Sequence, residues 1–157
     1  MTETWRRADG YEISTDKGRI DLDVVHGFLT RIYWSENVPR DVVSRSISGA
    51  FCFSVFDPAG AQAGFGRVIT DFATFAYLSD IFVLEAHRGK GLAKWMVGLM
   101  LDHPQLQGLR RWLLGTRDAQ ALYSQFGFED VPAGRLMGRR GLPDGGYAAL
   151  SIGETGR

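Results

Sequence analysis

The feature that most constrains the fold is the segment YLSDIFVL, residues 77–84, in which Asp80 is the one charged side chain. An almost unbroken apolar run of this length predicts a strand that is buried on both faces of a sheet. A helical pattern follows closely, because apolar residues recur at helical spacing from Leu92 to about Asp102. The chain is therefore expected to place a central strand against a helix in a layered fold.

The remaining predicted elements alternate in type along the chain. Strands are predicted at Tyr11–Thr15, Phe51–Phe56, Ala63–Thr70 and Arg111–Leu114, with a weak one near Tyr147–Ile152; helices are predicted from Asp21 to about Trp34, from Pro39 to about Ser48 and from Asp118 to Phe126. The order β-α-α-β-β-β-α-β-α-β indicates an α+β or mixed α/β fold. Because the sequence contains no internal repeat and no linker, its 157 residues are expected to form a single domain, 1–157.

Composition argues against several broad classes of protein. The chain is 45% hydrophobic and 23% charged, which is typical of a globular protein. Its formal net charge is zero, whereas nucleic-acid and membrane-surface proteins usually carry a basic excess. The single cysteine, Cys52, can form neither an internal disulfide nor a multi-cysteine metal site, and is expected to be a buried small hydrophobe. The polar N-terminus and the lack of an apolar run of about 20 residues predict a cytoplasmic protein.

The segment between the central strand and its helix has the features of an anion site. It contains Arg88-Gly89-Lys90-Gly91, directly before the helix. The first N–H groups of a helix lack internal partners and carry partial positive charge, and glycines let a phosphate approach the backbone. The alternative is a sharp strand-to-helix turn whose basic side chains face water. The segment is neither a P-loop nor a complete G-x-G-x-x-G dinucleotide motif, because Lys94 stands at the third glycine position.

Two motifs in this chain resemble those of the GNAT N-acetyltransferase family. Arg88, Gly91 and Ala93 occupy the fixed positions of that family's (Q/R)-x-x-G-x-(G/A) motif, which binds the pyrophosphate of acetyl-CoA. The segment TRDAQALYSQFGF, residues 116–128, is similar to the family's N-x-x-A-x-x-L-Y-x-x-x-G-F segment, with Thr116 in place of the asparagine. Both motifs occur in the family's order, and together they cover residues 77–128 most clearly.

The resemblance implies a fold, an activity and a cofactor-binding surface. The fold would be a twisted, mixed, mostly antiparallel sheet flanked by helices and splayed near Asp80. The activity would be direct transfer of an acetyl group from acetyl-CoA to an amine, with a small molecule favoured over a peptide or protein, and it requires no metal. The cofactor's pantetheine arm would pair with the backbone of one strand, at Ile81, Phe82 and Val83. Its pyrophosphate would lie on the following loop, at Arg88, Gly89, Lys90, Gly91, Leu92 and Ala93. Thr116 can also bond the cofactor, with a shorter reach than asparagine.

Two residues are candidates for the chemistry. Tyr123 falls on the family's tyrosine and would protonate the departing CoA thiolate, since a phenol is protonated at neutral pH; the alternative is a packed core aromatic. Asp80 would be the base for the acceptor amine, because a carboxylate within an apolar strand is costly unless it has a hydrogen-bonding partner or a catalytic function. Its alternative is a structural carboxylate that accepts hydrogen bonds from an arginine or from the backbone.

Other assignments stay open at the level of sequence. His26, Tyr33 and Trp34 are candidates for the acceptor site, with a satisfied histidine and core or rim aromatics as the alternatives. Arg135, Arg139 and Arg140 would meet an acidic substrate or, as is favoured, lie in a solvated loop. A CoA-binding sensor without chemistry and a nucleotide-phosphate site are the competing functions. A homodimer is compatible with the sequence.

Overall fold

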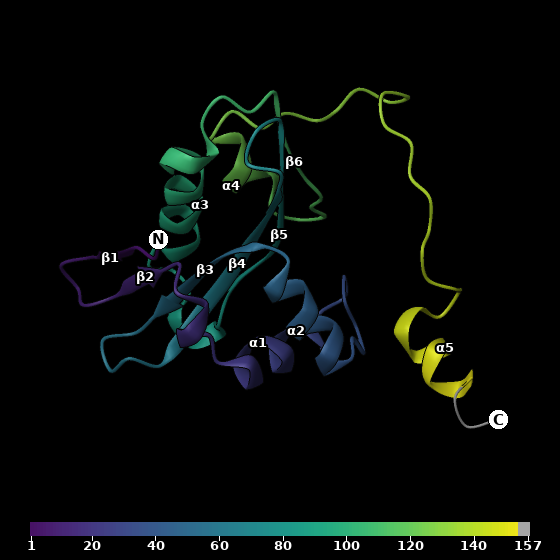
Figure 1. Ribbon diagram of the computed structural model, residues 1–157, viewed down its shortest axis with the longest axis horizontal. Coiled ribbons are helices and arrows are strands. Elements are labelled where there is room, and N and C mark those ends of the chain that lie inside the picture. The colour runs from purple at the N-terminus through teal and green to yellow at the C-terminus, as the bar shows by residue number, and fades with distance from the viewer. Residues whose placement is uncertain (154–157) are drawn as a thin grey trace.

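A six-stranded sheet organises residues 1–153, the part of the chain that the computed structural model describes (Figure 1). Its strands are β1 (Thr4–Arg6), β2 (Glu12–Ser14), β3 (Phe51–Phe56), β4 (Gln62–Thr70), β5 (Phe75–Val83) and β6 (Arg111–Leu114). The helices are α1 (Leu22–Leu29), α2 (Arg40–Ser48), α3 (Leu92–Asp102), α4 (Gln120–Ser124) and α5 (Gly146–Gly153), with short 3-10 turns at Lys17–Arg19, Glu85–His87 and Pro104–Leu106. Strands β1 to β5 pair antiparallel in chain order, and β6 joins β5 in parallel.

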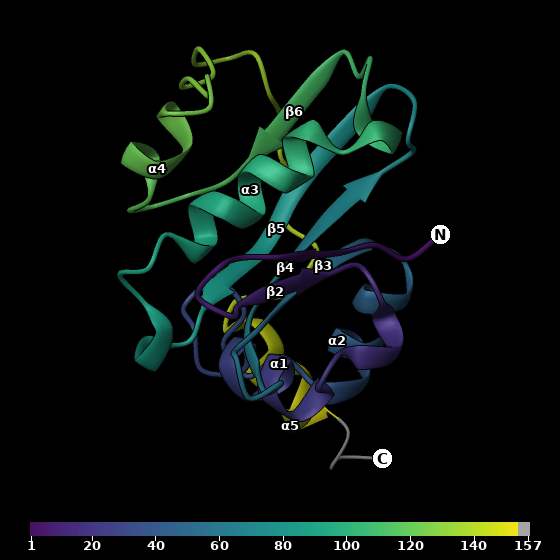
Figure 2. The ribbon, with the colours of Figure 1, turned by 90° about the vertical axis from the view of Figure 1, so that its left-hand side faces the viewer.

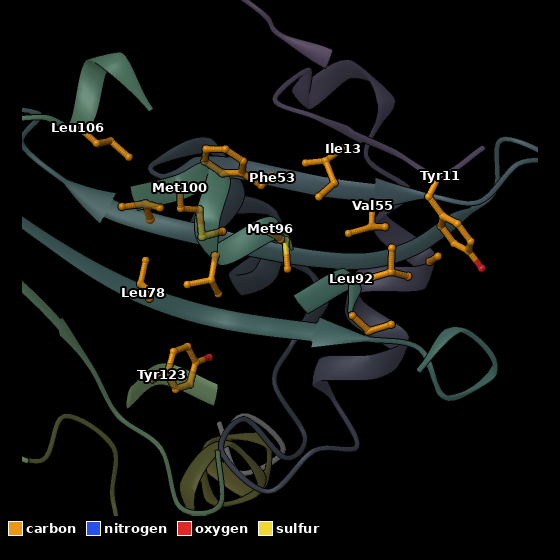
Figure 3. Packing of buried hydrophobic residues seen from close by; sticks show 14 of the residues in the cluster. Tyr11, Ile13, Phe53, Val55, Leu78, Leu92, Met96, Met100, Leu106 and Tyr123 are labelled. Atoms are coloured by element: carbon orange, nitrogen blue, oxygen red, sulfur yellow. The ribbon is translucent and has the colours of Figure 1, made fainter. Parts of the chain in front are cut away.

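Helices cover both faces of the sheet. Figures 1 and 2 place α3 on one face and α1 with α2 on the other. The core on the α3 face contains the buried residues Ile13, Phe53, Val55, Val68, Leu78, Leu92, Met96, Met100 and Tyr123, most of which are labelled in Figure 3. The core on the opposite face contains Val25, Leu29, Val43, Cys52, Phe65 and Phe82. Side chains that alternate along β3 to β5 thus point into two apolar layers, one on each face of the sheet. Burial in these layers stabilises the central strands from both sides.

Strand β5 separates from β6 halfway along its length. The two strands pair from Phe75 opposite Arg111 to Leu78 opposite Leu114, and β5 then continues to Val83 without a strand on that side. On its other side, the pairing of β5 with β4 shifts register between Phe65 and Arg67, so that Asp80 and Ile81 stand opposite Gly66 alone. This is a β-bulge, and Asp80 takes a left-handed backbone conformation with φ of 54°. The bulge lies where the sheet opens.

The structure confirms the predicted mixed, mostly antiparallel sheet flanked by helices and corrects several elements. The predicted weak strand at Tyr147–Ile152 is wrong, because this segment lies within helix α5. The first helix ends at Leu29 instead of Trp34, and the residues between them form turns. The short strand β1 was not predicted, because three residues are too few for a periodic pattern. No helix in residues 1–153 is long and apolar enough to cross a membrane.

Gly64 in β4 gives a test of how closely the central strands pack. A Cβ atom at this position would lie 2.8 Å from the backbone oxygen of Phe82 and 3.2 Å from Cγ2 of Val55. We expect Gly64→Ala to lower the free energy of unfolding by roughly 2 kcal/mol, because a buried backbone has to shift. Gly138→Ala is the control, since nothing lies within 4 Å of its added Cβ. Urea unfolding of both variants measures the difference, and equal stabilities would contradict the packing described here.

Candidate functional site

The opening between β5 and β6 leads into a cavity of about 990 Å³. Residues of β5, of the turns between α1 and α2, and of the segment from β6 to α4 line it, with Arg88 and Ala93 at the loop end and Tyr147 from α5. The cavity therefore brings together segments that are far apart in the sequence. Among the predicted site residues, it is lined by Tyr33, Trp34, Asp80, Ile81, Phe82, Val83, Arg88, Ala93, Thr116 and Tyr123.

The glycine loop lies between Arg88 and Ala93, which line one end of this cavity, whereas Gly89, Lys90, Gly91 and Leu92 are not among the lining residues. Gly89 and Gly91 have φ of 78° and 71°, and nothing lies within 4 Å of a Cβ added to either. This backbone conformation favours glycine, and it leaves the space beside the loop free for a ligand. The first internal hydrogen bond of α3 runs from the N–H of Trp95 to the oxygen of Gly91, so the preceding N–H groups of the helix have no partner within it.

The two basic side chains of the loop are exposed, and each makes a contact with a neighbouring part of the protein. The ammonium of Lys90 lies 5.9 Å from the ring centre of Tyr11. Nε of Arg88 donates to the carbonyl oxygen of Val83 at 3.0 Å, at the end of β5. Leu92 is buried in the core on the α3 face. The donors that the loop offers are therefore its backbone N–H groups, the positive end of the α3 dipole and the Nη groups of Arg88, which lines the cavity.

Tyr123 lies in α4 and reaches the cavity from the β6 side. Its side chain is largely buried, which raises the pKa of the phenol. Its ring packs edge-to-face against Phe128 at 6.0 Å between centroids and belongs to the core on the α3 face. Tyr123 is thus both a packed aromatic and a protonated hydroxyl at the cavity. The nearby Thr116 hydroxyl accepts a hydrogen bond from the N–H of Ala119 at 2.9 Å, and its own hydrogen stays available for donation.

Asp80 is held by two partners at the bulge. Its Oδ2 accepts from Nε of Arg67 at 2.7 Å, and its Oδ1 accepts from Nε1 of Trp34 at 3.0 Å. The side chains of Arg67 and Asp80 are only 16% and 9% exposed, so this ion pair is shielded from solvent. The contact with Trp34 ties the turns after α1 to the centre of the sheet.

Aromatic and charged groups meet at the mouth of the cavity. The guanidinium of Arg117 lies 3.6 Å from the centre of the Tyr33 ring, and Tyr33 packs edge-to-face on Trp34 with centroids 5.1 Å apart. Tyr33 and Trp34 are 42% and 43% exposed, a large fraction for aromatic side chains. The stack of Arg117 on Tyr33 joins the two sides of the opening, because Arg117 follows β6 and Tyr33 follows α1.

Several residues considered from the sequence lie outside this arrangement. His26 does not line the cavity, and its Nε2 lies 3.0 Å from the carbonyl oxygen of Val38 in a hydrogen bond. Cys52 is buried, and burial raises the pKa of its thiol to about 11, so that the group is protonated at neutral pH. Arg135, Arg139 and Arg140 are exposed, and Arg140 pairs with Asp144.

A family profile decides the assignment. The profile described as "Acetyltransferase (GNAT) domain" matches residues 49–130, which is more than half of the 157 residues. The chain belongs to the GNAT acetyltransferase family. The matched range runs from the start of β3 past α4, and so contains the bulge, the glycine loop and Tyr123.

Similar proteins agree with this assignment. A crystal structure from Xanthomonas campestris pv. campestris, described as belonging to the GNAT family, is 42% identical and has a TM-score of 0.79; the match covers 83% of this GNAT chain and 92% of that one. A Gibberella zeae protein named as an acetyltransferase is 28% identical over 145 residues, which covers 78% and 80% of the two chains. A Clostridium acetobutylicum acetyltransferase structure with acetyl-CoA shares the fold, at 10% identity and a TM-score of 0.59, over 89% of this chain and 96% of its own.

Among the lining residues that were not predicted as site residues, three carry groups suited to recognition: Arg67, Arg117 and Tyr147. Arg67 had no local signal, because its contact with Asp80 depends on the pairing of β4 with β5 and on the register shift within it. Arg117 lies within the recognised motif of residues 116–128, at a position that the motif leaves free. Tyr147 comes from helix α5, which the sequence analysis took for a strand.

The ion pair between Arg67 and Asp80 leads to a stability prediction. We expect Arg67→Met to lower the free energy of unfolding by about 3 kcal/mol, because it leaves a shielded carboxylate without its cation. Arg45→Met is the control, since Arg45 pairs with Asp41 at the surface, where both side chains are about three-quarters exposed. Urea unfolding at neutral pH compares the two variants. A loss for Arg67→Met no greater than for Arg45→Met would show that the pair contributes little.

Proposed function

We propose that this GNAT protein transfers an acetyl group from acetyl-CoA directly to an amine in a ternary complex. The observation that carries the proposal is the free edge of β5 from Ser79 to Val83, which runs from the bulge to the glycine loop and faces the same cavity as Tyr123. The Clostridium acetobutylicum neighbour, solved with acetyl-CoA, supports this choice of donor. The whole chain, 1–157, is proposed to act as one catalytic domain.

The proposed donor site fits the groups that the chain presents. The backbone of Ile81, Phe82 and Val83 would pair with the amide groups of the pantetheine arm, as an added strand pairs with a sheet edge. The N–H groups of residues 88–93 would bind the pyrophosphate, with the α3 dipole adding positive potential. The hydroxyl of Thr116 would donate to the arm from the β6 side. When bound, acetyl-CoA supplies the acetyl thioester.

Tyr123 is the proposed general acid. Its hydroxyl would donate a proton to the CoA sulfur as the thiolate departs. Burial raises the pKa of this phenol, so it stays protonated over the neutral range. Its proton is then available for transfer to the CoA thiolate as the thiolate leaves. The buried ring, packed on Phe128, would keep the hydroxyl in one position between β5 and α4.

Asp80 is the proposed base for the acceptor amine, acting directly or through a water. A carboxylate offers about four lone-pair positions, and the contacts with Arg67 and Trp34 use two of them. Tyr33, Trp34 and Arg117 would border the acceptor at the cavity mouth. The stack of Arg117 on Tyr33 bridges this mouth, which favours a small amine over a peptide or protein amine.

The contacts of Asp80 also support a second function. Because Arg67 and Trp34 already hold both carboxylate oxygens, the cavity could bind CoA without a base for the acceptor. The protein would then be a CoA-binding sensor. Incubation with acetyl-CoA and a panel of small amines and peptides, followed by detection of free thiol, separates the two functions. CoA binding without thiol release from any acceptor would favour the sensor.

A substitution tests the role of Tyr123. We expect Tyr123→Phe to lower kcat about a hundredfold, since general acid catalysis contributes at least that factor. Affinity for acetyl-CoA should change less than twofold, because the ring and its packing remain. Steady-state kinetics and calorimetric titration measure the two quantities. An unchanged kcat would remove Tyr123 as the acid.

A second substitution tests the position of the pyrophosphate. Gly91→Trp should abolish CoA binding by filling the space beside the loop. Gly108→Trp is the control, because Gly108 has a similar φ of 76° and equally open surroundings, and lies beyond the C-terminal end of α3, opposite to the end that carries the glycine loop. Calorimetric titration with CoA reports both variants. Normal binding by Gly91→Trp would place the pyrophosphate elsewhere.

A further inference from the structure

The turn of the first hairpin contacts the glycine loop, although 83 residues separate the two segments. Nη1 of Arg7, directly after β1, donates to the carbonyl oxygen of Lys90 at 2.9 Å. Within residues 1–153, no other hydrogen bond ties Gly89–Gly91 to a distant part of the chain. The loop proposed to bind the pyrophosphate is thus attached to an element that contributes nothing to the cavity lining.

The guanidinium of Arg7 is itself held in one orientation. Its Nε and Nη2 donate to the two carboxylate oxygens of Asp9 at 3.1 and 2.5 Å, in a bidentate pair. Its carbon Cζ lies 5.2 Å from the ring centre of Trp95 and 5.8 Å from that of Tyr11. The ion pair and the two rings leave Nη1 directed at Lys90.

The hairpin turn is attached on both sides of the loop. The hydroxyl of Tyr11 lies 2.7 Å from Nδ1 of His87, which precedes the loop, and Tyr11 is 6% exposed. Trp95, which follows the loop in α3, packs under Arg7. Within the turn, the N–H of Arg7 donates to the oxygen of Tyr11 at 2.9 Å. Arg7 therefore acts from a closed, anchored turn.

The bond to Lys90 determines the direction of the next N–H group. A trans peptide is planar, so the carbonyl of Lys90 and the N–H of Gly91 point in opposite directions. With the carbonyl fixed on Arg7, the N–H of Gly91 is directed away from the hairpin. Gly91 has no Cβ to limit rotation of this peptide, so an external contact is what can hold it.

We propose that Arg7 is a positioning residue for acetyl-CoA: it holds the peptide between Lys90 and Gly91 with its N–H directed at the pyrophosphate. This inference rests on the proposed function, because it takes the loop as the pyrophosphate site. Arg7 touches neither the cavity nor the proposed reacting atoms. Its effect should therefore fall on donor affinity and spare the affinity for ligands without a pyrophosphate.

The neighbouring Arg6 provides a matched control. It lies in the same hairpin and pairs with Glu12 at 2.5 Å, as Arg7 pairs with Asp9, but it is 76% exposed and makes no contact with the loop. Arg6→Ala and Arg7→Ala each remove one paired cation from the hairpin. Any difference between them reports the bond to Lys90 and the stacking on Trp95, and not the loss of a charge.

The experiment titrates the full chain with CoA by calorimetry. We expect Arg7→Ala to weaken CoA binding about tenfold, Arg6→Ala to change it less than twofold, and Arg7→Lys to restore part of the loss. Affinity for pantetheine, which lacks the pyrophosphate, should be equal in wild type and Arg7→Ala. Hydrogen exchange without CoA should be faster at the amide of Trp95, whose N–H donates to Gly91 within the loop, in Arg7→Ala and unchanged in Arg6→Ala.

The alternatives give different results. Equal CoA affinity of Arg7→Ala and Arg6→Ala would overturn the proposal, as would an equal loss of pantetheine affinity, which indicates general damage. If Arg7→Ala does not fold, Asp9→Asn keeps the cation and loosens its orientation, and it must then weaken CoA binding for the proposal to stand. Failure of the wild type to bind CoA would reject the proposed function, while the exchange measurement still decides whether Arg7 orders the loop.

Discussion

The β-bulge at Asp80 is the constraint on which the rest of the site depends. Two residues of β5, Asp80 and Ile81, stand opposite Gly66 alone, and this extra residue bends the strand and redirects its side chains. A Cβ on Gly66 would lie 3.1 Å from Cγ1 of Ile81 and within 3.2 Å of side-chain atoms of Met96 and Met100. The bare backbone of Gly66 thus lets α3 pack closely over the bulge, at the level where β5 and β6 part.

Ion pairs lie at both ends of the site. Asp80 projects toward Arg67 and Trp34, so the turns after α1 are drawn over the end of the opened sheet. At the other end, Arg7 and Asp9 pair beside the glycine loop. Such pairs fix positions by directional hydrogen bonds, and they add little long-range field to attract a ligand. Arg88 and Arg117, which line the cavity, form no ion pair within residues 1–153, so positive potential in the cavity comes from them.

Local patterns predicted the central elements well, because their signals lie in contiguous residues. The apolar run before Val83, the glycines before α3 and the helical spacing within it are all short-range features. Helix α5 was taken for a strand because a short apolar run fits either type, and its place is set by the packing of Tyr147 against the α1–α2 core. The sequence did not identify the partners of Asp80, for another reason. They depend on a register shift and on the turns before Trp34, and neither has a local signature.

The glycine loop shows how a correct motif can suggest an incomplete physical account. Its sequence, with Arg88 and Lys90 around glycines, suggested an anion site with added side-chain charge. In the structure, Lys90 lies over Tyr11, and Arg88 donates through Nε to the carbonyl of Val83 while it also lines the cavity. Anion binding at this loop then depends largely on backbone N–H groups, whose strength comes from direction and pre-organisation, with the Nη groups of Arg88 as further donors. The motif therefore specifies mainly the backbone conformation of the loop. A residue as distant in sequence as Arg7 can help to hold this conformation although it lies outside the motif.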